Sequence, residues 1–305
     1  MSDFNVGEVE VTKVVEWEGE IAPLGQIVPD SPRELWQANE SWLAPDHWHP
    51  DTDAYHAGIQ TWLLRSEGKV ILVDTGVGND KDRWHLPLFD HWHTAYLDRL
   101  AEAGVRPEDV DLVINTHIHN DHVGWNTYLS DGEWAPTFPN ATYLISAVDN
   151  EYWHPDNAER RITTRDEQTR RRHEGSKLIY ADSIEPVLPQ AVLWREEYRV
   201  DGNLSLEPAP GHTPGSTAVR LASGSDRAVF VGDLLHSPVQ ILEPDHNSCF
   251  CEDPAQAAET RRRVLARAAD NHELVIPAHF AGASAAEVRR DGNRFTISRW
   301  ASATG

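Results

Sequence analysis

The chain alternates short apolar runs with turn residues over most of its length, a pattern that predicts many strands and few long helices. In the first half, such runs predict strands at residues 9–17, 59–64, 70–73 and 111–115. The second and third of these are expected to pair through a turn near residues 67–68. Residues 93–103 are spaced as a helix, because Leu97 and Leu100 share one face and Gly104 follows where a helix would end.

The second half repeats this pattern, with strands predicted at residues 204–206, 217–221, 228–231, 273–276 and 294–297. A helix is expected from Pro254 to about residue 269, because Asp253 is a strong N-cap and proline is favoured in the first turn. Groups of strands separated by helices, with polar residues clustered at strand ends, predict an α/β layered fold whose sites lie on loops.

We expect one domain spanning residues 1–305, with two segments that depart from the regular pattern. Residues 1–58 form an N-terminal extension, and about residues 146–183 form a charged helical insertion over the core. The arginines of the insertion raise a phosphate site as one alternative: Arg160, Arg161, Arg165, Arg170, Arg171 and Arg172. Because acidic residues are interleaved with them, a solvated helix face is favoured.

Composition and charge narrow the function classes. The 305 residues include 27 Lys plus Arg against 49 Asp plus Glu, a net charge of −22 that repels phosphate backbones and anionic lipid. We therefore expect neither nucleic acid nor membrane as a partner. An apolar run of signal-peptide or membrane-spanning length is not found, and Cys249 and Cys251 are expected to be free thiols. The expected location is the cytoplasm.

Candidate chemistry is concentrated in residues 116–122, directly after a predicted buried strand. This segment carries three imidazoles and a carboxylate. If it were extended, side chains 117, 119 and 121 would point the same way, and His122 would be turned elsewhere by a bend. His117 and His119 are then expected to hold one cation, while Asp121 and His122 hold a neighbouring one.

Three more ligand-type residues follow strands or glycine turns later in the chain. His212 lies in a loop bounded by glycine and proline, Asp233 follows an apolar run that ends in Gly232, and His279 again follows a strand. Isolated, each would be an ordinary turn residue. Together with the 116–122 segment they predict a site for two divalent metal ions. Imidazole and carboxylate ligands suit zinc, with manganese, iron or cobalt as alternatives.

This arrangement resembles the metallo-β-lactamase superfamily from about Ile59 to Phe295, including an early Asp74-Thr75-Gly76 segment. The resemblance implies a four-layer αββα sandwich and a dinuclear hydrolase. It also implies the ligand roles: His117, His119 and His212 for the first metal, Asp121, His122 and His279 for the second, and Asp233 as a bridge. Asp74 would orient a ligand imidazole, and a metal-bridging hydroxide would attack the substrate.

Residues 232–240 and the 21-residue spacing from His212 to Asp233 resemble the branch that contains N-acyl homoserine lactonases and methyl parathion hydrolase-like enzymes. Many lactonases of that branch have a tyrosine three residues after the bridging aspartate, whereas this chain has His236. Two roles remain open for His236: a histidine of the core, or a hydrogen-bond donor to the substrate carbonyl. Asp121 is expected to orient or accept a proton. The resemblance adds a homodimer as an expectation.

The resulting hypothesis is hydrolysis of a small-molecule lactone or carboxylic ester, with a quorum-quenching acyl homoserine lactonase as its specific form. Alternatives are an organophosphate triesterase at the same site and, less favoured, a thiolester hydrolase or a nucleic-acid processing hydrolase. A diiron redox module is disfavoured by His119, where such proteins usually place a glutamate. Four tryptophans are candidates either for the walls of an apolar pocket or for core packing: Trp36, Trp42, Trp48 and Trp125. The His-Trp-His triplets at 47–49 and 91–93 are expected to be loops.

Overall fold

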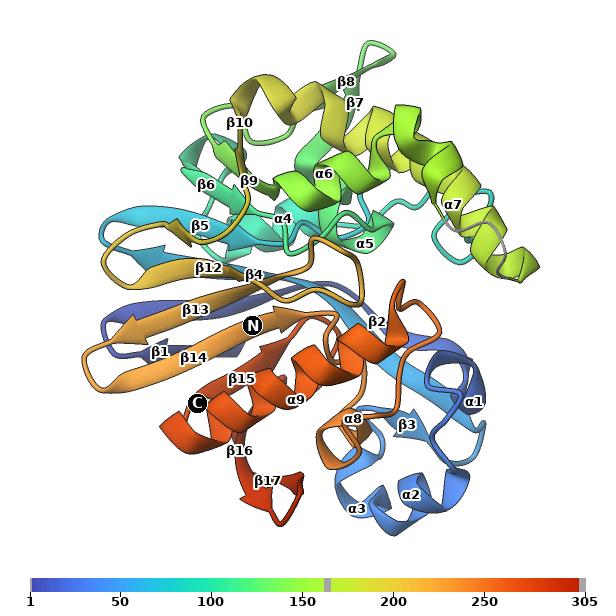
Figure 1. The fold of residues 1–305 in the computed structure, drawn as a ribbon. Helices are drawn as coiled ribbons and strands as arrows, with labels where there is room; N and C mark the ends of the chain where they lie inside the picture. Colours follow the sequence, from blue (N-terminus) through green and yellow to red (C-terminus); the bar gives the residue numbers. More distant parts are fainter. Residues whose placement is uncertain (1, 162–165, 302–305) are drawn as a thin grey trace.

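The computed structural model describes residues 2–161 and 166–301. Two mixed β-sheets lie face to face with helices on their outer sides (Figure 1). The first sheet has the order β1 (Ser2–Val6), β2 (Val9–Pro23), β4 (Ala54–Ser66), β5 (Lys69–Val73), β6 (Leu112–Ile114), β9 (Thr142–Ser146) and β10 (Ala191–Trp194), with β3 (Trp48–His49) paired to β4. The second follows chain order: β11 (Tyr198–Arg199), β12 (Leu204–Pro208), β13 (Thr217–Ser223), β14 (Asp226–Gly232), β15 (Leu274–Pro277), β16 (Ala285–Asp291) and β17 (Arg294–Ala301). β7 (Thr127–Ser130) and β8 (Glu133–Pro136) form a separate hairpin.

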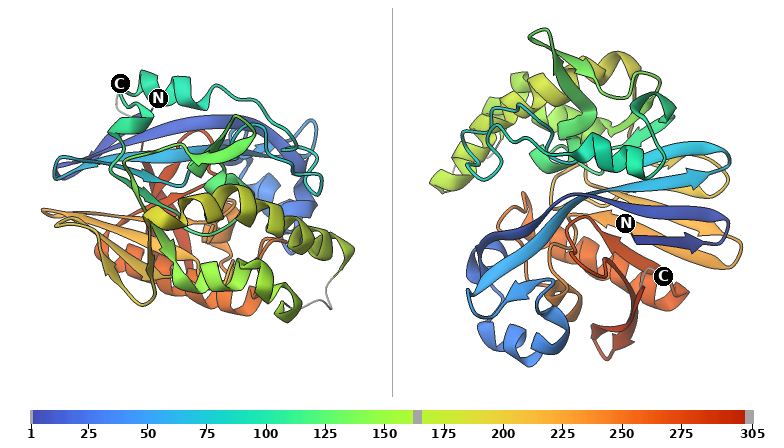
Figure 2. Two further views of the ribbon diagram at one scale, coloured as in Figure 1. Left: turned by 90° about the horizontal axis from the view of Figure 1, so that it is seen from above. Right: turned by 180° about the vertical axis from the view of Figure 1, so that it is seen from behind.

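Helices cover both outer faces, as the views from above and behind also show (Figure 2). Over the first sheet lie α4 (Tyr96–Glu102), α5 (Asn120–Val123), α6 (Ala147–Trp153) and α7 (Glu167–Ile179), with the short helices η1 (Pro107–Asp109), η2 (Gly124–Asn126), η3 (Pro155–Arg160), η4 (Tyr180–Ile184, a π-helix) and η5 (Glu185–Gln190). Against the second sheet lies α9 (Pro254–Asn271), and α8 (Val239–Leu242) precedes it. The N-terminal region adds α1 (Leu24–Ile27), α2 (Arg33–Ala38) and α3 (Glu40–Leu43).

Three apolar clusters hold these layers together. Leu64, Ile71 and Phe230 belong to a buried cluster shared by the two sheets. A second cluster joins the first sheet to its helices, and a third packs α9 against the second sheet. Burial of these faces is the main favourable free energy of folding. The predicted four-layer α/β sandwich is confirmed.

The chain start is more regular than its sequence suggested. β2 runs to Pro23, because it pairs with β4 beyond the predicted end at residue 17, through register shifts near Trp17 and Glu20. The expected division at residue 58 therefore falls inside β4. Trp36 and Trp48, both at most 1% exposed, pack in a local core with Tyr55.

The insertion is helical, but its arginines are not uniformly solvated. Arg170 and Arg171 are exposed as expected, whereas Arg161 is only 3% exposed and lies over the ring of Trp153. Arg172 crosses to the loop before α9, where it donates a hydrogen bond to the carbonyl of Cys249. Arg165 and the side chain of Arg160 lie outside the described part of the chain. The solvated-face expectation is thus wrong for Arg161 and Arg172.

Parallel pairing positions the functional residues. β5, β6 and β9 are parallel neighbours in the first sheet, and β14 and β15 are parallel in the second. Since carboxyl ends of parallel strands meet at one sheet edge, the segments after β5, β6, β14 and β15 converge between the sheets. No helix of the described residues is long and apolar enough to span a bilayer.

Candidate metal centre

The segment after β6 bends sooner than its spacing suggested. His119 is extended and acts as the N-cap residue of α5, so Asn120 and Asp121 already lie in a helical turn. The expected alternation of side chains through residue 121 is therefore wrong, because a helical turn rotates successive side chains by about 100°. The result is still two groups of ligand-type atoms, with Asp121 grouped with His122 and away from His117.

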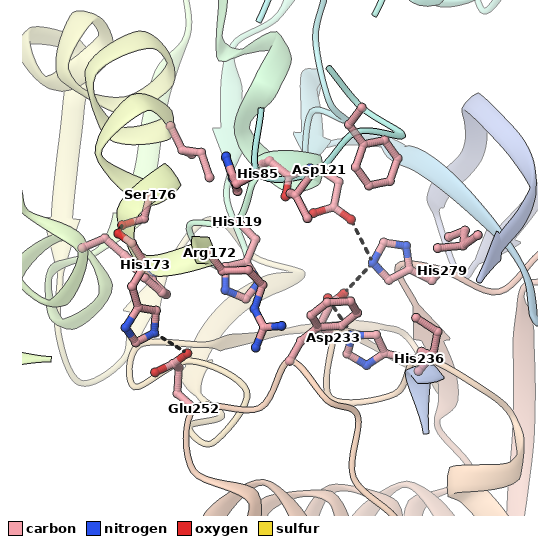
Figure 3. A pocket seen from close by; sticks show the side chains of 18 of the residues that line it. His85, His119, Asp121, Arg172, His173, Ser176, Asp233, His236, Glu252 and His279 are labelled. Carbon is pink, nitrogen blue, oxygen red and sulfur yellow. Dashed lines mark hydrogen bonds and ion pairs between the residues drawn. The ribbon is translucent and has the colours of Figure 1, made fainter. Parts of the chain in front are cut away.

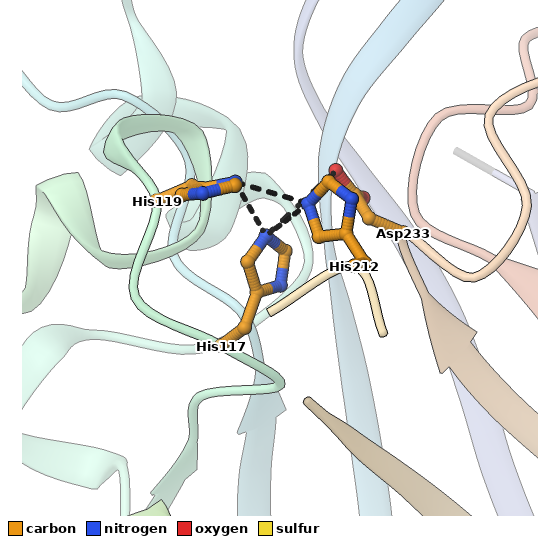
Figure 4. Close-up of side chains that lie close together, drawn as sticks. All are labelled: His117, His119, His212 and Asp233. Carbon is orange, nitrogen blue, oxygen red and sulfur yellow. Dashed lines mark hydrogen bonds and ion pairs between the residues drawn. The ribbon is translucent and has the colours of Figure 1, made fainter. Parts of the chain in front are cut away.

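The first group consists of His117, His119, His212 and Asp233, whose ligand atoms all lie within 4.8 Å of one another (Figure 4). The three imidazole nitrogens form a tight triangle. His117 Nε2 lies 3.1 Å from His119 Nδ1 and 3.1 Å from His212 Nε2, and the third side measures 3.0 Å. Residues 95 positions apart in the chain thus aim nitrogens at one point.

The second group consists of Asp121, His122 and His279. His279 Nε2 lies 3.5 Å from Asp121 Oδ2, and His122 Nε2 lies 3.8 Å from Asp121 Oδ1. His122 is almost fully buried, while Asp121 retains partial exposure on the pocket side. This group therefore combines two imidazoles and a carboxylate at the floor of an open pocket.

Asp233 stands between the groups with one oxygen toward each. Its Oδ1 lies 3.2 Å from His122 Nε2 and 3.0 Å from His279 Nε2. Its Oδ2 lies 3.3 Å from His212 Nε2 and 3.7 Å from His117 Nε2. A carboxylate in this position can contribute one oxygen to each of two neighbouring cations.

The surroundings of the buried polar atoms test whether cations fit here. The Nε2 of His122 and the Oδ1 of Asp233 are sealed from solvent, and the polar atoms beside them are other ligand-type atoms of the centre. In the first group, three neutral imidazoles cannot satisfy one another, because each has a single N–H and a single lone pair. Converging imidazole nitrogens and a buried carboxylate set among them both fit divalent cations, and the clusters are consistent with a dinuclear site.

The electrostatics agree with neutral nitrogen ligands in the first group. Burial lowers the pKa of His117 and of His212 well below the usual histidine value, and Asp233 only partly offsets it. Burial also lowers the pKa of His119, to about 4. These imidazoles are therefore uncharged near neutrality, which is the form that binds metal.

Each of three imidazoles is oriented through its other nitrogen. His122 Nδ1 lies 2.8 Å from Asp74 Oδ2, His279 Nδ1 lies 2.9 Å from the carbonyl of Gly58, and His117 Nδ1 lies 3.1 Å from Thr116 Oγ1. Such contacts set the tautomer and raise the basicity of the ligand nitrogen. The contact between Asp74 and His122 matches the expected orienting role of Asp74.

Asp149 of α6 links the loops that carry the first group. Its carboxylate accepts hydrogen bonds from the backbone N–H of Ile118 at 2.8 Å and of Gly215 at 2.8 Å. The side chain is fully buried, and burial raises its pKa to about 6. One carboxylate therefore holds the His117–His119 loop at a defined distance from the His212 loop.

Replacing Asp149 with Asn is expected to weaken metal binding about 10- to 100-fold, because an amide offers only one acceptor oxygen to the two N–H groups. Competition with a chelator measures this, and thermal melting of the metal-free protein separates a loop effect from general instability. Asp156→Asn, at a side chain that is 89% exposed, is the matched control. Equal metal affinity in both variants would contradict the role.

The centre opens into a pocket (Figure 3). Its apolar lining includes Ile21, Ile27 and Phe250, together with Leu86 and Phe89 of the loop after β5. Residues of α7 also line it. Among the described residues, the pocket lining includes Trp153 but none of the four tryptophans considered from the sequence: Trp36, Trp42, Trp48 and Trp125. Trp125 is buried and donates to Glu16, so core packing is its role.

His236 lies beside the Asp233 carboxylate, with Nε2 3.1 Å from Asp233 Oδ2 and 3.4 Å from Ser248 Oγ. It lines the pocket, and burial lowers its pKa. Sequence reasoning missed other pocket residues: His85, Arg172, His173, Ser176 and Glu252. No local signal marks them, although the i, i+1, i+4, i+7 spacing of residues 172, 173, 176 and 179 is that of one helix face.

The minor expectations agree with the structure except at residues 47–49, where Trp48 and His49 form strand β3 instead of a loop, because they pair with β4. Cys249 and Cys251 are not joined in a disulfide bond. The His-Trp-His triplets contribute to neither ligand group among the described residues. His91 and His93 are exposed, whereas His47 is buried against Phe280 and Trp300.

Layered sheets with His/Asp clusters at converging strand ends define a class of metal-binding α/β proteins. A model of the metallo-beta-lactamase superfamily matches residues 55–279, and the chain therefore belongs to this superfamily. It is a metal-dependent hydrolase of that family.

Known relatives and structures agree on the fold. The chain is 26% identical over 244 residues to metallo-beta-lactamase domain-containing protein 1 of Rattus norvegicus, covering 78% of this chain and 74% of that protein. The dizinc quorum-quenching lactonase AidC, solved with the product N-hexanoyl-L-homoserine, superposes with a TM-score of 0.79 at 21% identity over 97% of this chain and 95% of its own. The hydrolase AbOPH superposes with a TM-score of 0.79 at 22% identity over 97% and 96%.

Proposed function

We propose that this chain hydrolyses lactones or carboxylic esters, with N-acyl homoserine lactones as the specific candidates. The observation that carries the proposal is Asp233 standing between two ligand groups at the floor of a largely apolar pocket. The similarity to AidC, a lactonase solved with an acyl homoserine product, supports the choice of substrate.

The proposed ligand assignment follows the two groups. His117, His119 and His212 would hold one cation, Asp121, His122 and His279 the other, and Asp233 both; zinc is the proposed metal. Two cations held there would acidify a water molecule and polarise a substrate carbonyl.

The chain's own residues supply the remaining chemistry in this proposal. Asp121, on the pocket side of the second group, orients or accepts the proton of the attacking water. His236 donates a hydrogen bond to the carbonyl oxygen as negative charge develops there. The apolar walls hold the acyl chain and exclude bulk water from the reacting bond.

A substrate panel tests the proposal directly. Protein loaded with zinc, manganese or cobalt is assayed on a γ-lactone, an aryl ester and an aryl phosphotriester. We expect the lactone to have the highest kcat/KM, and a chelator to remove the activity until metal is restored. Fastest turnover of the phosphotriester would favour the triesterase alternative, and no turnover of lactone or ester would reject the proposal.

A further inference from the structure

His85 occupies the pocket wall contributed by the loop between β5 and α4, away from the metal ligands in the sequence. Leu86 and Phe89 of the same loop and Ile179 of α7 line the same pocket, in which Figure 3 labels His85. A polar ring among apolar neighbours is the arrangement by which binding pockets select one functional group of a ligand.

The position of the His85 ring is tightly constrained. A Cβ built on Gly175 of α7 would lie 2.1–2.3 Å from three ring atoms, so the ring packs directly against the helix backbone. The loop itself is anchored two residues earlier. Arg83 donates to both carboxylate oxygens of Asp182, at 2.7 and 2.9 Å, and all these groups are buried. The imidazole is therefore held by a fixed framework.

The His85 ring is neutral and has one nitrogen to spare. His85 is 8% exposed, and burial together with the nearby charge of Arg83 lowers the pKa of its imidazole to about 4. Nδ1 is buried and has no hydrogen-bond partner. Nε2 is not among the buried atoms that lack a partner, and it forms no hydrogen bond within the described residues, so it is accessible from the pocket. Because an unpaired buried N–H is rarer than an unpaired acceptor, the proton is expected on Nε2.

Other polar side chains of the same wall are already engaged with the protein. His173 Nε2 lies 3.0 Å from Glu252 Oε1, and the Ser176 hydroxyl donates to the carbonyl of His173 at 2.7 Å. Arg172 donates to Thr169 and to the loop before α9. Asn120 also lines the pocket, but its Nδ2 is sealed from solvent. An accessible ring nitrogen thus remains on His85.

We propose that His85 is a specificity-determining residue whose Nε2–H donates a hydrogen bond to an acceptor that the substrate carries beyond the cleaved bond, such as an amide carbonyl oxygen. The inference rests on the proposed function and deepens it. His85 would distinguish amide-bearing lactones from simple alkyl lactones, because an alkyl lactone places only methylene groups against the His85 ring. A site built to hydrogen-bond a ligand group discriminates against analogues that lack it.

The test compares kcat/KM for N-hexanoyl homoserine lactone with that for a γ-lactone carrying an alkyl chain of equal length. His85→Leu is expected to lower the value for the amide-bearing substrate about tenfold more than for the alkyl lactone, the effect of one neutral hydrogen bond. His85→Gln, whose amide can donate, should restore much of the preference. Gly175→Ala should reproduce His85→Leu, because the new Cβ would displace the ring.

Phe89→Leu is the matched control, since it alters an apolar side chain of the same loop and should change both substrates alike. Equal losses on the two lactones in His85→Leu would overturn the inference while leaving lactone hydrolysis intact. If the wild type hydrolyses neither lactone, the proposed function fails instead. The same variants are then compared on aryl esters with and without an acyl amide, where an unchanged ratio overturns the role of His85.

Discussion

Asp233→Asn is expected to reduce kcat/KM at least about 10³-fold and to lower the bound metal below two ions per chain. One carboxylate oxygen faces His122 and His279, and the other faces His212. An amide is neutral and has a single good ligand oxygen, so it cannot serve both cations. Losing a cation that stabilises the transition state costs several kcal/mol, which corresponds to about three orders of magnitude in rate.

Three measurements on the same preparation decide this prediction: steady-state kinetics, elemental analysis of metal content and circular dichroism. The matched control is Asp291→Asn, at the exposed end of β16 and a member of neither ligand group. The control should keep both metals and wild-type rates. If Asp233→Asn also keeps two metals per chain, the bridging assignment is wrong.

Asp121→Asn is expected to remove most turnover, about 10²- to 10⁴-fold in kcat, while the fold survives. Asp121 lies on the surface of the pocket, 3.5 Å from His279, so its loss removes both a proposed ligand of the second cation and a proton acceptor. The three nitrogens of the first group do not depend on this side chain, since Asp233 is their carboxylate neighbour. One metal per chain should therefore remain.

The comparison of Asp121→Asn with Asp121→Glu refines the test. Glutamate keeps the charge but moves it by one methylene, so metal content should recover more than kcat does. Metal titration and the pH dependence of kcat in both variants measure this. Wild-type rates in Asp121→Asn would show that the proposed mechanism is wrong.

Local chemistry made several elements predictable. Asp253 caps α9 by accepting from the backbone N–H of Gln256, as an aspartate before proline suggests. β4 and β5 pair around the turn near residues 67–68, where both Glu67 and Gly68 have positive φ. Such features depend only on residues a few positions apart, so they can be predicted from the local sequence. The helix at Tyr96–Glu102 starts later than expected, because Thr94 donates its backbone N–H to Asn79.

Long-range pairing made other elements unpredictable. β10 was missed because it pairs in parallel with β9, a strand that lies much earlier in the chain. The tryptophans of the first 58 residues suggested a pocket wall. Trp36 and Trp48 instead pack in a local hydrophobic core. Conversely, Arg172 in a charged run reaches the pocket, since the packing of α7 decides which face of the helix turns inward.

The sequence by itself determined the ligand types, their order and their position after strands, because imidazoles and carboxylates at turns are visible without a fold. Only the tertiary structure decided which atoms meet: Asp233 between the two groups, Asp149 across two loops and His85 against Gly175. The physical reason is that these contacts arise where parallel strand ends of two sheets converge and where one helix packs on one loop. Both depend on the sum of many apolar contacts, which no short stretch of residues encodes.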